Sequence, residues 1–248
     1  GKTIIAGGGS PGQIGEARLF DAETGELQQV LGTTLDVVLD VQLNPAGDKL
    51  AIAGADGAVQ IFNLADGKSI RTITSHSDWI MAVAWNADGT QIASASRDKT
   101  AKVFDVETGE LLVTYGGHSQ PVQGVAFHPN NTLVYSSGKD NKIHWWNKAD
   151  GKKSGELALG GEVFKLQQSS AFIFAASADK SVRQLDAAAQ KEVRKYTGHG
   201  DWALSSDYHF DTKRVASGGF NGDIQIWNAE DGKSVLSFVA APGISKKE

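Results

Sequence analysis

The sequence contains no cysteine, and this excludes several kinds of functional site. Without cysteine, the 248 residues cannot form disulfides, thiolate zinc sites, attached c-type haem or a cysteine nucleophile. Proline is scarce, with 5 residues, and no Ser/Gly-rich spacer or block of like charge marks a linker. We therefore expect residues 1–248 to form a single domain. The cellular compartment stays undecided, because oxidising and reducing environments both tolerate proteins without cysteine.

Long apolar runs and clusters of positive charge are absent as well. No run approaches the roughly 18 apolar residues of a membrane span, and no segment is typical of a signal peptide. Lysine and arginine total 24 against 29 aspartate and glutamate residues, a net charge of −5, and the basic residues are scattered apart from Lys246 and Lys247. We predict neither a membrane span nor nucleic acid as the partner.

The first residues match the spacing of a nucleotide-binding loop. An apolar stretch, residues 3–6, leads into Gly7, Gly9 and Gly12, the G-x-G-x-x-G pattern that lets a backbone approach a pyrophosphate. That motif requires a helix after the glycines, whereas the next residues, "EARLFDAETGEL", alternate like a strand and end in a turn. We interpret the glycines as a turn about three residues longer than its counterparts, with a partner-contact loop and a phosphate loop as the alternatives.

One pattern recurs six times along the chain. Segments such as "VQIFNLADGKS" and "AKVFDVETGEL" align on a large apolar residue, and the steps between these anchors are 42, 42, 42, 39 and 42 residues. So regular a period excludes a single dinucleotide-binding unit and indicates a repeat architecture. The anchors are Phe20, Phe62, Phe104, Trp146, Leu185 and Trp227.

Each copy has the pattern of short β-strands. In the second copy Val59 and Ile61 alternate with Gln60 before the anchor, which is the period of a half-buried strand. After the anchor, Asp or Asn begins a turn that closes at a glycine, where we expect a positive φ. These positions are Gly25, Gly67, Gly109, Gly151 and Gly232, with Gln190 in the fifth copy.

A further turn and an apolar strand earlier in each copy bring the total to four short strands per repeat. No segment carries a helical stripe, and one such sheet cannot cover both of its own faces, so the copies must stack around an axis. We predict an all-β fold, a β-propeller of four-stranded antiparallel blades, with six blades in this chain and the first of them incomplete.

The chain resembles the WD-repeat β-propeller family, whose pattern is Gly-His, strand, turn, strand, Asp and finally Trp-Asp. In three copies the histidine lies 28 residues before the anchor. The resemblance implies that His, Ser, Asp and the anchor Trp satisfy one another in a structural network. The matching residues are His76, Ser94, Asp98 and Phe104; His118, Ser136, Asp140 and Trp146; and His199, Ser217, Asn221 and Trp227.

Ser, His and Asp recurring together superficially suggest a hydrolase triad. A triad occurs once, at a pocket with an oxyanion site, whereas this set is repeated in three copies with the same His-to-anchor spacing. His118 and His128, or His199 and His209, are ten residues apart, without carboxylates at ligand spacing. We predict no catalytic residue, no metal and no cofactor.

Two copies and the start of the chain depart from the family pattern. The second copy has Thr34 for His and Ile52 for Ser, and the fifth lacks the His, so we expect these blades to be less tightly held. The first copy lacks its first strand. Because the family most often closes with seven blades, we expect one blade and one strand upstream of Gly1 on a longer natural chain. A six-bladed ring is the alternative.

The resemblance also implies where a partner binds. Contact positions are three and five residues after the histidine and the residue before the blade Asp, on what we term the top face. In the second copy these are Val37, Leu39 and Ala55, and Pro121 is a fourth-copy member. We expect partner contacts from Trp79, Met81, Arg97, Gln123, Lys139, Trp202, Leu204 and Phe220.

Trp79 and Trp202 are the largest of these residues, and aromatic side chains dominate binding energy at such rims. The alternative is that both indoles merely pack on neighbouring loops. Arg97 and Lys139 favour a peptide with a carboxylate next to an apolar anchor.

We interpret the chain as a non-catalytic scaffold that binds a protein or peptide, and its repeated "TGEL" and "DGK" turns as bacterial in style. The alternative is the propeller of a larger bacterial redox or hydrolytic protein, with its catalytic or cytochrome-like module upstream.

Overall fold

The computed structural model describes residues 2–240, which form β-strands joined by turns and contain no helix. Every sheet is antiparallel and is made of consecutive strands. We number the sheets as blades 1 to 6 in chain order. Blade 1 has three strands, and blades 2 to 6 have four each. None of the described residues lies in a helix that is long and apolar enough to cross a membrane.

The strands of blades 1 to 3 are β1 (Thr3–Ser10), β2 (Ile14–Asp21) and β3 (Leu27–Thr34); β4 (Val38–Leu43), β5 (Lys49–Gly54), β6 (Ala58–Asn63) and β7 (Ser69–Thr74); and β8 (Ile80–Trp85), β9 (Gln91–Ser96), β10 (Ala101–Asp105) and β11 (Leu111–Tyr115). Those of blades 4 to 6 are β12 (Val122–Phe127), β13 (Leu133–Gly138), β14 (Lys142–Asn147) and β15 (Lys153–Ala158); β16 (Val163–Ser169), β17 (Phe172–Ser177), β18 (Ser181–Asp186) and β19 (Lys191–Thr197); and β20 (Ala203–His209), β21 (Arg214–Gly219), β22 (Asp223–Asn228) and β23 (Ser234–Val239).

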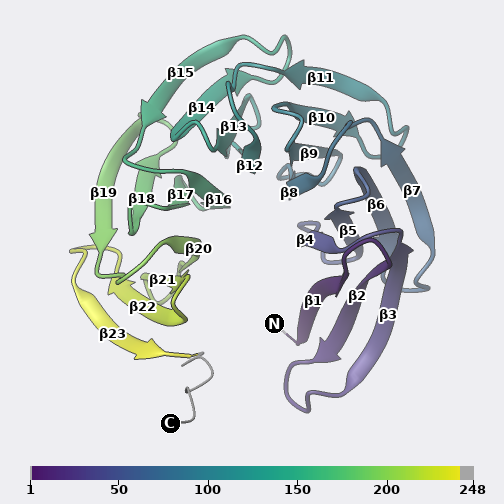
Figure 1. The fold of residues 1–248 in the computed structure, drawn as a ribbon, viewed down its shortest axis with the longest axis horizontal. Helices are drawn as coiled ribbons and strands as arrows, with labels where there is room; N and C mark the ends of the chain where they lie inside the picture. Colours follow the sequence, from purple (N-terminus) through teal and green to yellow (C-terminus); the bar gives the residue numbers. More distant parts are fainter. Residues whose placement is uncertain (1, 241–248) are drawn as a thin grey trace.

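The six blades are arranged around a central axis, as Figure 1 shows. The first strand of each four-stranded blade lies nearest the centre and the last strand forms the outer edge. Blades 1 and 6 flank a sector that the ribbons leave open (Figure 1). The predicted β-propeller of six blades, with an incomplete first blade, is therefore confirmed.

Each hydrophobic core lies between two neighbouring blades. One cluster joins Ile61 of blade 2 to Ile92 of blade 3, and another joins Val103 of blade 3 to Val134 of blade 4. Three more clusters link blades 1 and 2, blades 4 and 5, and blades 5 and 6 in the same way. Apolar residues on both faces of a strand thus find partners in the two adjacent sheets, which is why the sequence needs repeats.

The anchor of each repeat packs against the preceding blade. Phe104 joins the core shared with blade 2, and Trp146 joins the core shared with blade 3. Both lie beside a β-bulge between their own strand and the last strand of the blade, as the other anchors do. Phe20 is the exception, because none of the described residues forms a preceding sheet to cover it, and it is only partly buried.

The turns after the anchors have the conformation expected from their glycines. Gly109 has a φ of 76°, and its amide donates to the carbonyl oxygen of Asp105 at 2.9 Å. The Asp105 carboxylate accepts a hydrogen bond from the amide of Thr108 at 2.8 Å. Gln190, which replaces the glycine in blade 5, has a φ of 53°.

The glycines at the start of the chain belong to a long β-hairpin. They lie in or after β1, and β2 follows directly, so the helix that a nucleotide-binding loop requires is not there. A Cβ atom on Gly7 would lie 2.7 Å from Cγ1 of Val38, so glycine lets β1 approach blade 2. The amide of Gly12 donates to Oδ1 of Asp36 at 2.8 Å, which ties the hairpin tip to the loop before β4.

We expect Gly109→Ala to lower the free energy of unfolding by about 1 kcal/mol, because alanine is strained at a positive φ. Gly116 is the matched control, since its φ is not in the left-handed region and a Cβ there meets nothing within 4 Å. Urea unfolding monitored by tryptophan fluorescence measures both variants. Equal stability of the two would contradict the expectation.

Candidate binding face and its polar network

A chain of hydrogen bonds connects the top loop of blade 3 to its strands. Nδ1 of His76 lies 2.8 Å from Oδ2 of Asp98, and Nε2 lies 2.6 Å from Oγ of Ser94. The histidine comes from the loop before β8, the serine from β9 and the aspartate from the turn between β9 and β10. Thr100 adds a hydrogen bond to Oδ1 of Asp98 at 2.6 Å. The loop is thereby fastened to β9 and to the turn between β9 and β10.

Blade 4 repeats the arrangement and extends it to the anchor. His118 lies 2.8 Å from Asp140 and 2.9 Å from Oγ of Ser136. The indole N–H of Trp146 donates to the same Ser136 oxygen at 3.1 Å. Since this oxygen accepts from Trp146, its own proton is free to be donated to Nε2 of His118, while Nδ1–H of His118 donates to Asp140.

Blade 6 uses a different carboxylate from the one that the sequence predicted. Nδ1 of His199 lies 2.8 Å from Asp223, not Asn221, whose Oδ1 instead accepts from the amide of Asp223 at 3.3 Å. Asp223 stands where blade 3 has Thr100, two residues further along the turn. Its longer side chain reaches the imidazole from there, so the prediction of Asn221 was wrong.

The tryptophan of blade 6 also differs from its predicted role. The indole N–H of Trp227 donates to the carbonyl oxygen of Thr197 at 3.1 Å, and not to Ser217. The Ser217 hydroxyl contacts His199 at 2.9 Å and the carbonyl oxygen of Ser205 at 2.7 Å. The indole N–H of Trp227 still has a hydrogen-bond acceptor, but this acceptor is a backbone carbonyl at the end of β19.

The three Ser–His–Asp sets have the distances of a catalytic triad without its accessibility. Ser94 and Ser136 are 0% exposed and Ser217 is 3% exposed. A nucleophile must reach the carbonyl that it attacks, and a hydroxyl enclosed between two sheets cannot do so. Because each buried polar group here has a partner, the network contributes to stability instead.

Burial and hydrogen bonding change the acidity of the network. Burial alone would raise the pKa of Asp98, but hydrogen bonds from Thr100 and His76 outweigh it and bring the pKa to about 2. Burial lowers the pKa of His76 and His118 below the usual 6.5, although their aspartate partners oppose this. The imidazoles of His76 and His118 are therefore neutral at pH 7, and His76 is hydrogen-bonded to the charged carboxylate of Asp98.

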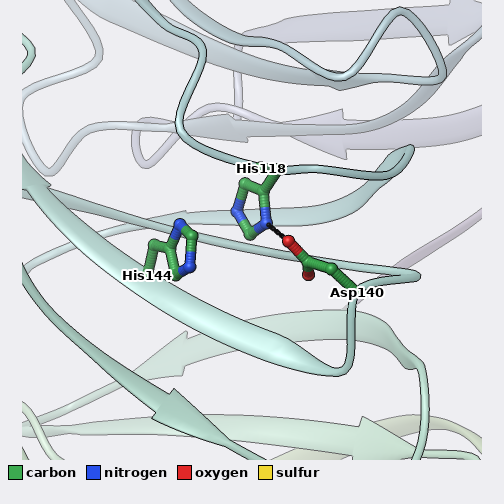
Figure 2. A group of neighbouring side chains, drawn as sticks. All are labelled: His118, Asp140 and His144. Atoms are coloured by element: carbon green, nitrogen blue, oxygen red, sulfur yellow. Dashed lines mark hydrogen bonds and ion pairs between the residues drawn. The ribbon is translucent and has the colours of Figure 1, made fainter.

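A second histidine stacks on the network in blade 4. The rings of His118 and His144 are 4.1 Å apart and nearly parallel, and the Tyr115 hydroxyl lies 2.8 Å from Nδ1 of His144. Figure 2 shows the hydrogen bond from His118 to Asp140, with His144 beside the imidazole of His118. Burial, assisted by His118, lowers the pKa of His144 to about 4.

Among the described residues, His118, Asp140 and His144 come closest to the geometry of a metal site, with ligand atoms within 4.8 Å of one another. Both nitrogens of His118 already contact Asp140 and Ser136, and Nδ1 of His144 contacts Tyr115. His118 would have to give up one of its two contacts before three ligands could face one ion, although Nε2 of His144 has no hydrogen-bond partner. We therefore interpret the group as a hydrogen-bonded cluster.

The blades that lack the histidine are held by other contacts. In blade 5, Arg183 bridges Asp179 of the turn before β18 and Glu192 of β19, and the Arg183–Asp179 pair is largely buried. The Thr34 hydroxyl, in the position of the blade 2 histidine, donates to the carbonyl oxygen of Asp36. The ion pairs of blade 5 lie in the same part of the blade as the His–Asp bond of its neighbours.

The predicted contact residues occupy equivalent places at the top of each blade. In every four-stranded blade the residue after the second strand donates its amide to a carbonyl in the loop before the first strand, at 2.8–3.0 Å. The pairs are Ala55 with Val37, Arg97 with Trp79, Lys139 with Pro121, Ala178 with Glu162, and Phe220 with Trp202.

Three aromatic side chains gather at the top of blades 5 and 6. The ring of Trp202 lies 5.7 Å from that of Phe164 and 5.6 Å from that of Phe220. Trp202 is 45% exposed and Phe220 is 63% exposed. We call Phe164, Trp202 and Phe220 the aromatic rim. Sequence reasoning missed Phe164 because blade 5 lacks the histidine from which the contact positions were counted.

The other predicted contacts divide into exposed and internally paired residues. Trp79 is partly covered by the guanidinium of Arg97, which lies 4.3 Å from the centre of its ring. Lys139 is 3.9 Å from Glu162. Gln123 is only 6% exposed, and its amide donates to Glu162 at 3.1 Å. We had expected Gln123 to contact a partner, but the buried side chain is not available for this. Leu204 is 37% exposed, and Met81 is partly buried.

An ion pair that the sequence did not predict joins blades on opposite sides of the axis. Nζ of Lys165, on β16, lies 2.7 Å from Oδ1 of Asp40, on β4. The other oxygen of Asp40 accepts from the amide of Val83 at 2.9 Å. Both charges come from innermost strands, so the pair connects blades 2 and 5 near the axis.

Stacked four-stranded sheets, with a polar network repeated in three of them, define a β-propeller built from sequence repeats. The family described as WD domain, G-beta repeat, matches residues 67–105, 109–147 and 190–228. Three repeats of the chain thus match the WD40 family, in agreement with the six-bladed β-propeller fold. Each matched repeat starts before the outer strand of one blade and ends at the third strand of the next. The comparison with curated proteins gave no match.

We expect Asp140→Ala and Asp223→Ala each to lower the free energy of unfolding by about 1–3 kcal/mol, because each leaves a buried imidazole N–H without its acceptor. Asn221→Ala is the control and should cost less than about 1 kcal/mol, since Asn221 makes only a turn contact. Thermal and urea unfolding measure all three. If Asn221→Ala is the more damaging change in blade 6, the assignment of Asp223 is wrong.

The stability should decrease in mild acid partly through His144. Its pKa is about 4 in the folded chain and near 6.5 when unfolded, so the unfolded chain takes up the proton first. The stability that the neutral His144 contributes is complete above pH 6.5 and is lost as the pH falls towards 4. His144→Gln should therefore lose less stability than the wild type between pH 7 and pH 4.5, measured by urea unfolding. Parallel losses would contradict this.

Proposed function

We propose that the protein is a non-catalytic scaffold that binds a partner protein or peptide through the aromatic rim. WD40 propellers commonly serve as platforms for protein interaction and are generally not enzymes. The observation that carries the proposal is the exposed cluster around Trp202. Large aromatic side chains are costly to leave in water and dominate the binding energy of protein interfaces.

Hydrogen bonds hold the loops around this cluster in place, which supports the proposal. His199, in the loop that carries Trp202, is bonded to Asp223 and Ser217, and Phe220 is fixed through its amide to the carbonyl oxygen of Trp202. A preorganised surface loses little conformational entropy when a partner binds. Leu204, on the first strand of the same blade, extends the apolar surface.

We expect Trp202→Ala and Phe220→Ala each to weaken capture of the partner by about 2 kcal/mol or more, about 30-fold, with little change in the melting temperature. The experiment compares proteins captured by the immobilised variants from a lysate of the source organism. Phe210→Ala is the matched control, because Phe210 is 62% exposed and lies in the turn between β20 and β21, at the other end of blade 6.

The proposal fails if every protein captured by the wild type is also captured by Trp202→Ala and Phe220→Ala. It also fails if Phe210→Ala loses the same proteins, because the binding face would then not be the top of blade 6. Circular dichroism and melting curves verify that each variant is folded.

A further inference from the structure

Blades 3 and 6 carry the same Asp–Trp pair at their tops, and only one pair has a cation. In both blades the aspartate accepts a hydrogen bond from the amide of the following tryptophan at 2.8 Å, so the carboxylates of Asp78 and Asp201 have the same local geometry. In both, the facing residue donates its amide to the tryptophan carbonyl at 2.9 Å. That facing residue is Arg97 in blade 3 and Phe220 in blade 6.

In blade 3 the Asp–Trp pair holds an arginine. Nε of Arg97 lies 3.1 Å from Oδ2 of Asp78, and its guanidinium carbon lies 4.3 Å from the centre of the Trp79 ring. The carboxylate thus pairs with the charge of the guanidinium, while the face of the indole packs against its plane. The protein itself shows which ligand this pair accepts.

In blade 6 the position of the arginine is taken by an aromatic ring. Within residues 2–240 no basic side chain lies within salt-bridge distance of Asp201. Lys180, from blade 5, donates its ammonium to the carbonyl oxygen of Gly200 at 2.8 Å instead. Asp201 therefore lies beside Trp202 with the cation of its blade 3 counterpart missing, while Phe220 and Phe164 add aromatic surface.

We propose that Asp201 and the aromatic rim bind an arginine side chain of the partner protein, with its guanidinium paired to Asp201 and packed on the exposed aromatic rings. This inference rests on the proposed function and specifies the partner's chemistry. The sequence suggested that the partner supplies a carboxylate, whereas this proposal gives the partner a cation. Arg97 is already paired with Asp78, and Lys139 lies near Glu162, so neither is free to attract a carboxylate. A carboxylate next to several aromatic rings attracts a cation and repels an anion.

The test is a titration of the full chain, labelled with 15N-tryptophan, with the peptide acetyl-Gly-Gly-Arg-Gly-Gly-amide. The control peptide has citrulline for arginine, which keeps the planar shape and removes the charge. The indole N–H signal of Trp202, assigned from Trp202→Phe, should shift saturably with the arginine peptide, and the citrulline peptide should bind about tenfold more weakly. A third peptide has lysine in place of arginine. Equal binding of the arginine and citrulline peptides, equal binding of the arginine and lysine peptides, or no shift at Trp202 would overturn the inference.

Exchanging the facing residues provides a matched pair of variants. Phe220→Arg should place an internal arginine on Trp202 and abolish the shift caused by the arginine peptide. Arg97→Phe should open the blade 3 pair, so that the Trp79 signal now shifts as well. Both side chains are at the surface, and unchanged melting curves show that the variants are folded. Peptide binding by Phe220→Arg at the wild-type level would overturn the inference.

The outcomes separate this inference from the proposed scaffold function. If Trp202→Ala loses its captured partner but Trp202 does not discriminate arginine from citrulline, the scaffold function stands and the arginine site is wrong. If the arginine peptide binds selectively but Trp202→Ala retains every partner, the arginine site exists and the rim is not the partner's binding face.

Discussion

The packing of each sheet against the next is the constraint on which the rest of the structure depends. The second strands of blades 2 to 5 are buried almost along their whole length, on both faces, which is possible only between two neighbouring sheets. The corresponding strands lie in blades 6 and 1, at the two ends of the arc. Of these, β21 is less buried, and β1 is largely exposed. Each blade therefore depends on its neighbours to bury the apolar faces of its strands.

The polar network follows from this packing. The histidine side chains of the loops that cross between blades are enclosed by this packing, so they must find internal hydrogen-bond partners. His76, His118 and His199 do so with a serine and an aspartate of their own blades. Because these bonds hold the loops from inside, the outward residues of the same loops are free to vary. Trp79 with Arg97, and Trp202 with Phe220, show two such variations on one backbone.

Several details of the site depended on side-chain reach, which a repeat alignment does not describe. The alignment placed Asn221 opposite His199, whereas Asp223 reaches the imidazole from two residues later. Phe164 and Lys165 lie in blade 5, for which no contact positions were counted from the sequence. Gln123 occupies a contact position by number but turns towards Glu162 and is buried. A longer or differently charged side chain can take over a role while the backbone register stays the same.

The sequence by itself determined the fold class, the number of blades in residues 2–240, the register of the anchors and the positive φ at the turn glycines. These follow from a period of 42 residues and from local rules of strand alternation and turn geometry, which act within one repeat. Only the tertiary structure decided which carboxylate meets His199, that Lys165 pairs with Asp40 near the axis, and that the aromatic rim joins blades 5 and 6. Such contacts bring together residues from different strands or blades, and their formation depends on distances of a few ångströms that no local pattern encodes.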